Sequence, residues 1–425
     1  MMIFMLFAVF LVTLFLGFPI AFCLGLSSLT YVFFADIPLV IIPQKIYTGI
    51  DVFVLLCVPG FILAGNLMNR GGITERIVGF SNAVMGHIRG GLGLANVGAS
   101  MIFAGISGTA VADSASVGAV MIPAMVKEGY ETDFSCAVTA SSSTIGPIIP
   151  PSLPMIIAGT LTGLSVAKLF IAGAIPGILL GLGLMAVSYF ISVKRHHPKG
   201  ERQSFKVIID KFKGAFWALL MTVVILVGIV GGIFTPTEAS IVAVLYAVLV
   251  GLFIYRELSL KDIPGIIIET AITTASLMVL VGLANLFGWI LTSEQIPQLI
   301  AKSMLSFTQN KYVILLLINL LLLFVGTFME TIAALIILFP VLLKVAISVG
   351  IDPIQFAIIA VLNLMIGLTT PPVGVCLFVT SGIGRISLGK ISWAILPFLA
   401  VSILVLLLVT YIPQISLFLP NLLFK

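Results

Sequence analysis

The chain has 425 residues, of which 60% are hydrophobic and 9% are charged, with a formal net charge of +5 and a mean hydropathy of +1.27. Soluble domains carry about a quarter of charged residues, so this composition excludes a soluble globular fold. Apolar runs such as Tyr312–Phe328 and Ile395–Val409 approach the ~20 residues that cross a hydrocarbon core. Because backbone polar groups in lipid must be satisfied internally, these runs predict an all-α polytopic membrane protein.

The first half of the chain is predicted to contain apolar helices interrupted by polar breaks. The N-terminal apolar stretch has no leading Lys or Arg and no small-x-small cleavage site, so we expect retained membrane helices up to Phe34 rather than a signal peptide. The elements expected next are a span at 52–68, an amphipathic helix at 74–85, a broken pair around 105–115, a broken helix around 146–154 and a span at 169–192.

A basic segment follows, Lys194–Lys213, which reads KRHHPKGERQSFKVIIDKFK. Short loops rich in Lys and Arg lie on the cytoplasmic side, so we predict a cytoplasmic linker. Binding of nucleic acid or of anionic lipid is the alternative for such a segment, but a loop that sets the topology is favoured and no nucleic-acid partner is expected. The lack of Lys or Arg before the first helix predicts an outside N-terminus.

The second half repeats the unusual features of the first half. The motif IGPIIPP at Ile145–Pro151 recurs as IGLTTPP at Ile366–Pro372. The same offset aligns Gly129 with Gly350, and an offset shorter by about one helical turn aligns Asp113 with Glu330. The elements expected are spans from about 215 to 289, an amphipathic piece near 294, a broken pair at 326–330, a broken helix at 367–374 and spans up to 411. Interrupted apolar segments at corresponding positions of two halves indicate the binding site of a secondary transporter.

The first break, GISGTAVADSASVGAV at 105–120, is too polar for a helix that faces lipid. A hairpin that turns back inside the protein would direct helix N-terminal amides towards anions and C-terminal carbonyls towards cations. Ser107, Thr109 and Ser114 would add hydroxyl oxygens. The alternative is a helix-packing surface of small residues in which Asp113 caps a helix.

The counterpart segment, VGTFMETIAAL at 325–335, places Glu330 between long apolar runs. Acids within a membrane are costly and suggest a role for ions or protons, although Glu330 could instead be an N-cap. The proline pairs have no N–H to donate, so carbonyls one turn earlier, near Gly146 and Gly367, are expected to lack helical partners and to suit sodium. The alternative is a pair of plain proline kinks rescued by hydroxyl groups.

Enzyme chemistry is not predicted. The four cysteines lie far apart in apolar surroundings, which is typical of small core residues. The three histidines lack metal-ligand spacing, and neither GxSxG nor HExxH occurs.

The segments GISGTAVADSASVGAVMIPAM, SSSTIGPIIPPS and GLTTPPVG resemble the large membrane subunit, the DctM or SiaM type, of tripartite ATP-independent periplasmic (TRAP) transporters. The resemblance extends over essentially the whole chain. It implies an ion-transporter-superfamily fold with two inverted-topology repeats, re-entrant hairpins, and an elevator-type transport domain that moves against a scaffold. The implied function is sodium-coupled import of a carboxylate-bearing solute, a sialic acid or a C4-dicarboxylate, across the bacterial inner membrane.

The resemblance also implies partners. A soluble periplasmic binding protein delivers the solute, and a small four-helix membrane subunit, the DctQ or SiaQ type, completes the permease. Because the chain begins directly with the large subunit's helices, we expect the small subunit to be a separate polypeptide. Two or more sodium ions are expected and no organic cofactor. The alternative is the membrane permease subunit of an ATP-driven uptake system, with a channel or a membrane enzyme less favoured.

Mapped onto this sequence, the resemblance divides the chain into a first repeat (1–193), the linker (194–213) and a second repeat (214–425). Scaffold and arm helices extend to about 90 and about 308, and the transport parts with hairpins at 91–127 and about 311–350 follow. The implied ligands of the first sodium are Ser107, Gly108, Ser142, Ser143, Gly146 and Pro150. Those of the second are Gly326, Thr327, Glu330, Gly367, Thr370 and Pro371. Solute binding is assigned to Ser107, Thr109 and Asp113, although Asp113 beside an acidic solute better suits a cation or an oriented hydroxyl.

Overall fold

The computed structural model describes residues 2–296, 299, 302, 308, 310–327 and 329–424, without side chains for 15 and 104–107. Across these residues the chain forms helices and connecting turns, with no strand and one isolated backbone bridge between Arg89 and Lys199. Seven of the described helices are long and apolar enough to cross a membrane, or up to nine if each of two bent pairs is one span. The prediction of an all-α polytopic membrane protein is confirmed.

The first half ends with a hairpin, a broken helix and a long span. Its helices are α1 (Met2–Phe15), α2 (Ile20–Phe34), α3 (Ile41–Ile50), η1 (Phe53–Leu56), α4 (Cys57–Arg70), α5 (Ile73–Met85), α6 (Gly91–Ser107), α7 (Ala110–Lys127), α8 (Thr132–Ser143), α9 (Leu153–Thr162) and α10 (Val166–Lys194). Local sequence sets the boundaries. Ser152 caps α9 by accepting a hydrogen bond from Met155 N at 3.2 Å, and Pro154 stands in the first turn, where its missing N–H costs nothing.

The second half has the same order of hairpin and broken helix. Its helices are α11 (Phe205–Val230), α12 (Pro236–Leu249), η2 (Val250–Ile254), α13 (Ile263–Ser293), α15 (Lys311–Gly326), α16 (Thr331–Ser348), α17 (Pro353–Gly367), α18 (Val375–Gly384), α19 (Leu388–Ala394), α20 (Leu396–Tyr411) and α21 (Gln414–Leu423). The hairpin α15–α16 corresponds to α6–α7, and the broken helix α17/α18 corresponds to α8/α9. Both breaks expected from the proline pairs are therefore present.

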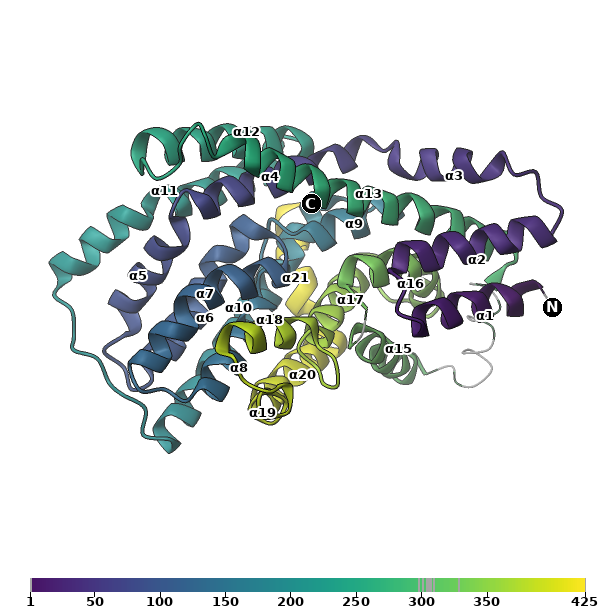
Figure 1. Cartoon of the computed structure of the whole chain (residues 1–425). Helices are drawn as coiled ribbons and strands as arrows, with labels where there is room; N and C mark the ends of the chain where they lie inside the picture. The colour runs from purple at the N-terminus through teal and green to yellow at the C-terminus, as the bar shows by residue number, and fades with distance from the viewer. Residues whose placement is uncertain are drawn as a thin grey trace.

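The broken helices form the centre of the molecule. Every residue from 134 to 143 in α8 and from 355 to 367 in α17 is buried, as expected of helices surrounded by other helices. The halves interlock, because α18 packs on α7 and α8 while α16 packs on α9. In Figure 1, α4, α12 and α13 run along the upper edge, and α6, α7, α8 and α18 lie beneath them.

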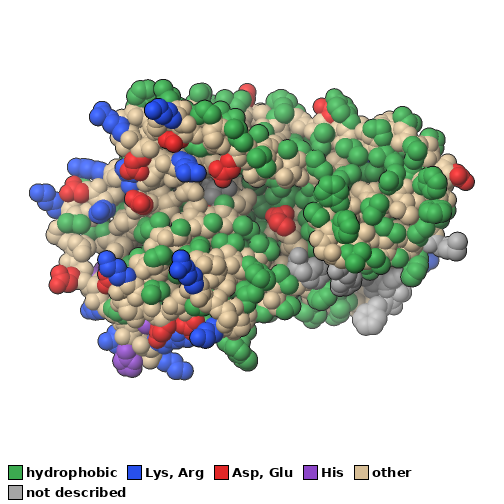
Figure 2. Space-filling view, viewed as in Figure 1, with side chains coloured by type: hydrophobic (Ala, Val, Ile, Leu, Met, Phe, Trp, Pro, Cys, Tyr) green, Lys and Arg blue, Asp and Glu red, His purple; other side chains and the backbone are tan. Residues whose placement is uncertain are grey.

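Charged side chains gather at one end of the molecule. Figure 2 shows Lys and Arg concentrated there, while hydrophobic side chains cover the middle and the opposite end of this face. Part of the predicted linker is helical: α10 extends to Lys194, and α11 begins at Phe205 rather than near Ala215. The sequence FKVIIDKFK explains the difference, since Ser204 caps this stretch by accepting from Val207 N at 3.4 Å and apolar residues recur along it.

Candidate functional site

The tip of the first hairpin rests on the start of α9. The tip turns at Gly108, whose φ of +65° is in the left-handed region that favours glycine, and Thr109 is extended before α7 begins. A Cβ on Gly108 would lie 3.4 Å from Leu153 Cγ, so the tip meets the chain just after the first break. The predicted role of the Ser107 side chain lies outside the described residues.

Asp113 faces the first break rather than an open surface. It is fully buried in the first turn of α7. A Cβ on Gly146 would lie 3.1 Å from Asp113 Cγ and would overlap with its Oδ2, so the carboxylate lies directly against this glycine. Beside it, Ser114 Oγ donates to Ser143 Oγ at 2.6 Å. Hairpin and break thus bring a carboxylate, two hydroxyls and a glycine backbone together.

Two further residues of the predicted first sodium set are placed differently. Ser142 faces α6, where its hydroxyl bonds Ser100 Oγ at 2.9 Å and Asn96 Oδ1 at 3.3 Å. Pro150 is buried later in the same turn, and the Pro150–Pro151 peptide bond is cis. The carbonyl of Gly146 accepts no hydrogen bond from any described residue, as expected because Pro150, four residues on, has no N–H.

At the second break the backbone closes differently. The Gly367 carbonyl lacks the helical partner four residues on, as expected, but it accepts a hydrogen bond from Thr370 N at 2.9 Å and is therefore not left unpaired. A tighter turn with an i→i+3 bond replaces the helical bond that Pro371 cannot make. The hydroxyls of Thr369 and Thr370 both bond the Ile366 carbonyl, at 2.9 and 2.8 Å. The Pro371–Pro372 peptide bond is cis.

The end of the second hairpin packs backbone to backbone on this break. A Cβ on Gly367 would lie 2.5 Å from Gly326 Cα, and Gly374 N donates to Thr327 O at 3.0 Å. Glu330 is the N-cap of α16, and its Oε2 accepts from Ile332 N at 2.9 Å and from Ala333 N. The N-cap reading of Glu330 is therefore correct for this oxygen, and Gly326, Thr327 and Gly367 of the predicted second set lie together.

Cys376 links the two breaks, which the sequence analysis did not anticipate. Its backbone N donates to Leu368 O at 3.0 Å across the second break. Its buried thiol lies beside the hydroxyls of Ser114 and Ser143 and close to Asp113. The available signal was its position, four residues after Pro372, at the start of the helix that resumes after the break.

A cavity of about 200 Å³ lies between the first hairpin and helices α4 and α13. Figure 2 shows this face hollowed near its middle. Of the residues predicted to bind the solute, Thr109 lines the cavity, whereas Asp113 is not among the lining residues. The other polar lining residues were not predicted to bind the solute; they are Asn66, Asn69, Ser116, Glu269 and Thr273. An acid within the apolar sequence IPGIIIET was the signal that would have identified Glu269.

A hydrogen bond joins α4 to the hairpin. Asn69 Nδ2 donates to Ser116 Oγ at 2.6 Å, while Asn66 Nδ2 donates to Thr270 Oγ1 of α13 at 3.1 Å. The first bond joins α4 to the hairpin, whereas the second joins α4 to α13.

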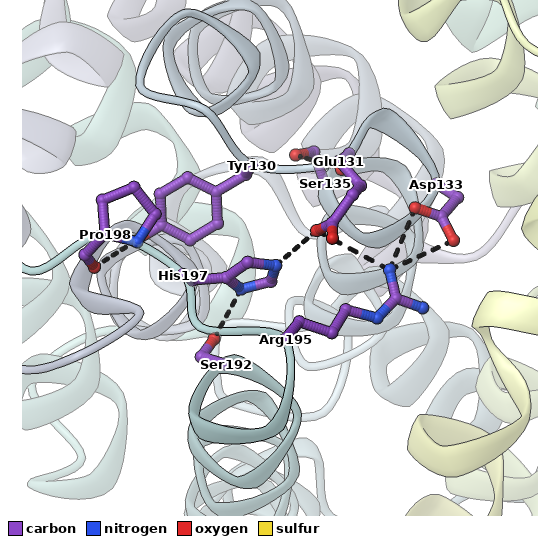
Figure 3. Close-up of polar contacts among 8 residues, drawn as sticks. All are labelled: Tyr130, Glu131, Asp133, Ser135, Ser192, Arg195, His197 and Pro198. Atoms are coloured by element: carbon purple, nitrogen blue, oxygen red, sulfur yellow. Dashed lines mark hydrogen bonds and ion pairs between the residues drawn. The ribbon is translucent and has the colours of Figure 1, made fainter.

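A polar cluster at the charged end of the molecule joins residues 192–200 to the start of α8. We call residues 192–200 the linker start. Figure 3 shows His197 between Glu131 and Ser192, with its Nε2 2.5 Å from Glu131 Oε2 and its Nδ1 3.0 Å from Ser192 Oγ. Arg195 pairs with both oxygens of Asp133, at 3.1 and 3.2 Å. Partial burial opposes the charge of Glu131, but the hydrogen bond from His197 and the nearby Arg195 outweigh it and lower the pKa of Glu131.

The fold resembles that of a solved transporter. The crystal structure of the Alcanivorax borkumensis YdaH transporter, which was described as having an unusual topology, matches with a TM-score of 0.60 at 16% identity. The match covers 87% of this chain and 86% of that chain. At this identity the likeness concerns the fold alone.

Sequence relatives are TRAP transporter permeases. The isethionate permease protein DctMQ of Oleidesulfovibrio alaskensis is 44% identical over 97% of this chain, which spans 65% of that protein's length. The sialic acid large permease protein SiaM of Vibrio cholerae is 44% identical over 96% of each chain. The C4-dicarboxylate large permease protein DctM of Pseudomonas aeruginosa is 43% identical over 94% of this chain and 93% of its own. The family model of the DctM component matches residues 7–415, so the chain belongs to the DctM component of the tripartite ATP-independent periplasmic transporters.

Proposed function

We propose that this chain is the large permease subunit that imports a compact organic anion across the bacterial inner membrane, driven by sodium. The observation that carries the proposal is the cavity between hairpin α6–α7 and helices α4 and α13, because the tip of that hairpin also touches the first break. One moving element would then contact both the solute and the coupling ion. An ATP-driven pump is not favoured, since the matching family is named ATP-independent.

The first break fits sodium in its donor set. Asp113 contributes a carboxylate, Ser114 and Ser143 contribute hydroxyls, and the Gly146 carbonyl has no hydrogen-bond donor among the described residues. Oxygen atoms of unwound backbone and of nearby side chains are what transporters use to hold sodium. This arrangement supports Asp113 as a proposed ligand of the cation rather than of the solute. For the second ion we retain Thr327, Glu330 and Thr370 as ligands, although each already makes a hydrogen bond.

The solute is proposed from chemistry shared by the relatives. Isethionate is a sulfonate, whereas sialic acid and C4-dicarboxylates carry carboxylates. The solute class that we propose is therefore an organic anion rather than a carboxylate alone. The cavity of about 200 Å³ is smaller than the ~300–1,000 Å³ of most ligand sites, which favours an anion of few carbon atoms over a nine-carbon sugar acid. Thr109 and the N-terminal amides of α7 would receive the acidic group.

An elevator movement is the transport step that we propose. Hairpins and broken helices would move together, because α16 packs on α9 and α18 packs on α7 and α8. The outer helices α4, α12 and α13 would stay in place. The Asn69–Ser116 hydrogen bond spans this boundary and would have to break during each cycle.

The proposal includes partners and an orientation. A periplasmic binding protein would deliver the solute, and a small four-helix membrane subunit would complete the permease. The charged end, which includes the linker, would face the cytoplasm, in keeping with the excess of Lys and Arg there.

The test is uptake by liposomes that contain this chain and its small subunit, with the binding protein and labelled anion outside and no ATP. An inward sodium gradient should drive accumulation that collapses when potassium replaces sodium. Uptake that ignores sodium and requires ATP would contradict the proposal. Asp113→Asn should shift the sodium dependence, and Asp210→Asn, on the exposed start of α11, is the matched control.

A further inference from the structure

The carboxylate of Glu269 lines the cavity. Glu269 lies on α13, one to two turns from its start, and its side chain is exposed to the cavity. No Lys, Arg or His is among the described lining residues. An acid placed within a membrane helix is costly, and such acids therefore mark functional sites.

The neighbouring polar groups do not neutralise Glu269. No ion pair or hydrogen bond joins its carboxylate to the described residues, and the nearby amides of Asn66 and Asn69 donate elsewhere, to Thr270 and Ser116. The Glu269 carboxylate is therefore left to bind solvent or the solute. A solute anion that approached it with its own charge would meet repulsion.

Opposite polarity exists on the other wall. Thr109 and the first turn of α7 belong to the hairpin side of the cavity, and helix N-terminal amides favour negative charge. The cavity therefore attracts an acidic group at the hairpin wall and accepts hydrogen bonds at the α13 wall. A solute that satisfies both walls has an acid at one end and a hydrogen-bond donor at the other.

We infer, on the basis of the proposed function, that Glu269 is a specificity residue that accepts a hydrogen bond from a hydroxyl or ammonium group of the solute. The carried solute is then a hydroxylated monoanion, or a zwitterion that carries one acidic group and one ammonium group. Plain alkyl acids leave the Glu269 carboxylate unpaired, and dicarboxylates place a second charge against it. A site built to bind a hydroxyl discriminates strongly against the analogue without it, because its own polar group would lose its partner.

The test compares acidic solutes that differ by one group, bound to the purified permease complex without the binding protein. The pair isethionate and ethanesulfonate differs by a hydroxyl, taurine replaces that hydroxyl with an ammonium group, and succinate supplies the dianion. Binding in sodium buffer is measured by calorimetry. Isethionate or taurine should bind at least ~10-fold tighter than ethanesulfonate and succinate, the strength of one hydrogen bond to a charged group.

Glu269→Gln should reduce this preference to within about twofold, and Glu269→Asp should retain part of it. Glu75→Gln, an exposed glutamate on α5 outside the cavity, is the matched control and should keep the full preference. Equal binding of ethanesulfonate, tighter binding of succinate, binding of no member, or a preference unchanged in Glu269→Gln would each overturn the inference. Sodium-driven uptake of an anion in liposomes would still support the proposed function in those cases, so the two failures can be distinguished.

Discussion

Replacing Gly367 with alanine tests whether the junction of the second hairpin and the second break holds a coupling ion. The added Cβ would lie 2.5 Å from Gly326 Cα, 2.6 Å from its C and 2.8 Å from its O. Ordinary contacts begin at about 3.4 Å, and every neighbour is backbone, so the hairpin end must move by nearly an ångström. Forcing a methyl group into such a contact costs about 1–3 kcal/mol.

The strain opposes the close packing of Gly326 on Gly367. An ion between Thr327 and Thr370 would require this close packing. A cost of about 1–3 kcal/mol weakens sodium activation by roughly 5- to 150-fold, at ~1.4 kcal/mol for each factor of ten. The half-saturating sodium concentration for uptake in liposomes should rise by this factor, while uptake at saturating sodium should fall less.

Gly382→Ala is the matched control because it lies in α18, after the same break, and nothing lies within 4 Å of the added Cβ. Alanine is a better helix former than glycine, so this variant should fold at least as well as the parent chain. Thermal unfolding of both variants separates ion binding from folding. An unchanged sodium activation curve for Gly367→Ala in a folded complex would refute an ion site at this junction.

Four further predictions concern single residues. Asp113→Asn should weaken sodium activation of uptake more than it changes the choice among anions, and an unchanged sodium curve would count against a cation role. Ser116→Ala removes the 2.6 Å bond with Asn69, worth about 0.5–1.5 kcal/mol, so the uptake rate should change by roughly 2- to 10-fold without a fall in thermal stability; an equal rate would show that the bond holds no transport state. Glu131→Gln should increase amide hydrogen exchange in the linker start. In the parent chain the folded pKa of Glu131 is lowered, so protection of these amides should be present above about pH 4.5. It should be lost as the pH falls through the lower folded pKa. Cys376→Val removes the thiol from Ser114 and Ser143 and should lower the cooperativity of sodium activation, whereas an unchanged Hill coefficient would exclude coupling through this side chain.

The sequence predicted those features that depend on backbone chemistry. Proline pairs and a run of small residues identified both breaks and the interrupted segment around 105–115, because proline has no N–H to donate and glycine readily adopts the positive φ that a tight turn requires. The direction in which each side chain points was harder to predict from the sequence. Ser142 and Ser143 are adjacent in sequence, yet one faces Ser100 and the other faces Ser114, since neighbouring residues of a helix point about 100° apart. Local patterns identify the break but not which hydroxyl points to it.

The cavity could not be predicted from the sequence. It is formed where α4 and α13 approach the hairpin, and this approach depends on packing between segments that are about 200 residues apart. Asn69 and Ser116 meet across it, although only Ser116 lies in a segment that the sequence analysis singled out. Glu269 was detectable as an acid within an apolar run, but nothing in its neighbourhood indicated which element it would face.

The interlocked halves provide a physical route between the two proposed ion sites. The segment Gly374–Cys376 bonds the second hairpin through Gly374 N and Thr327 O, and it spans the second break through Cys376 N and Leu368 O. Its thiol lies near the hydroxyls of Ser114 and Ser143 at the first break, where α18 packs on α7 and α8. A shift of the second hairpin tip therefore moves a backbone segment that contacts the first site, without a long chain of intermediates. Because packed backbone and buried side chains transmit displacement rather than absorb it, occupancy of one break should bias the geometry of the other.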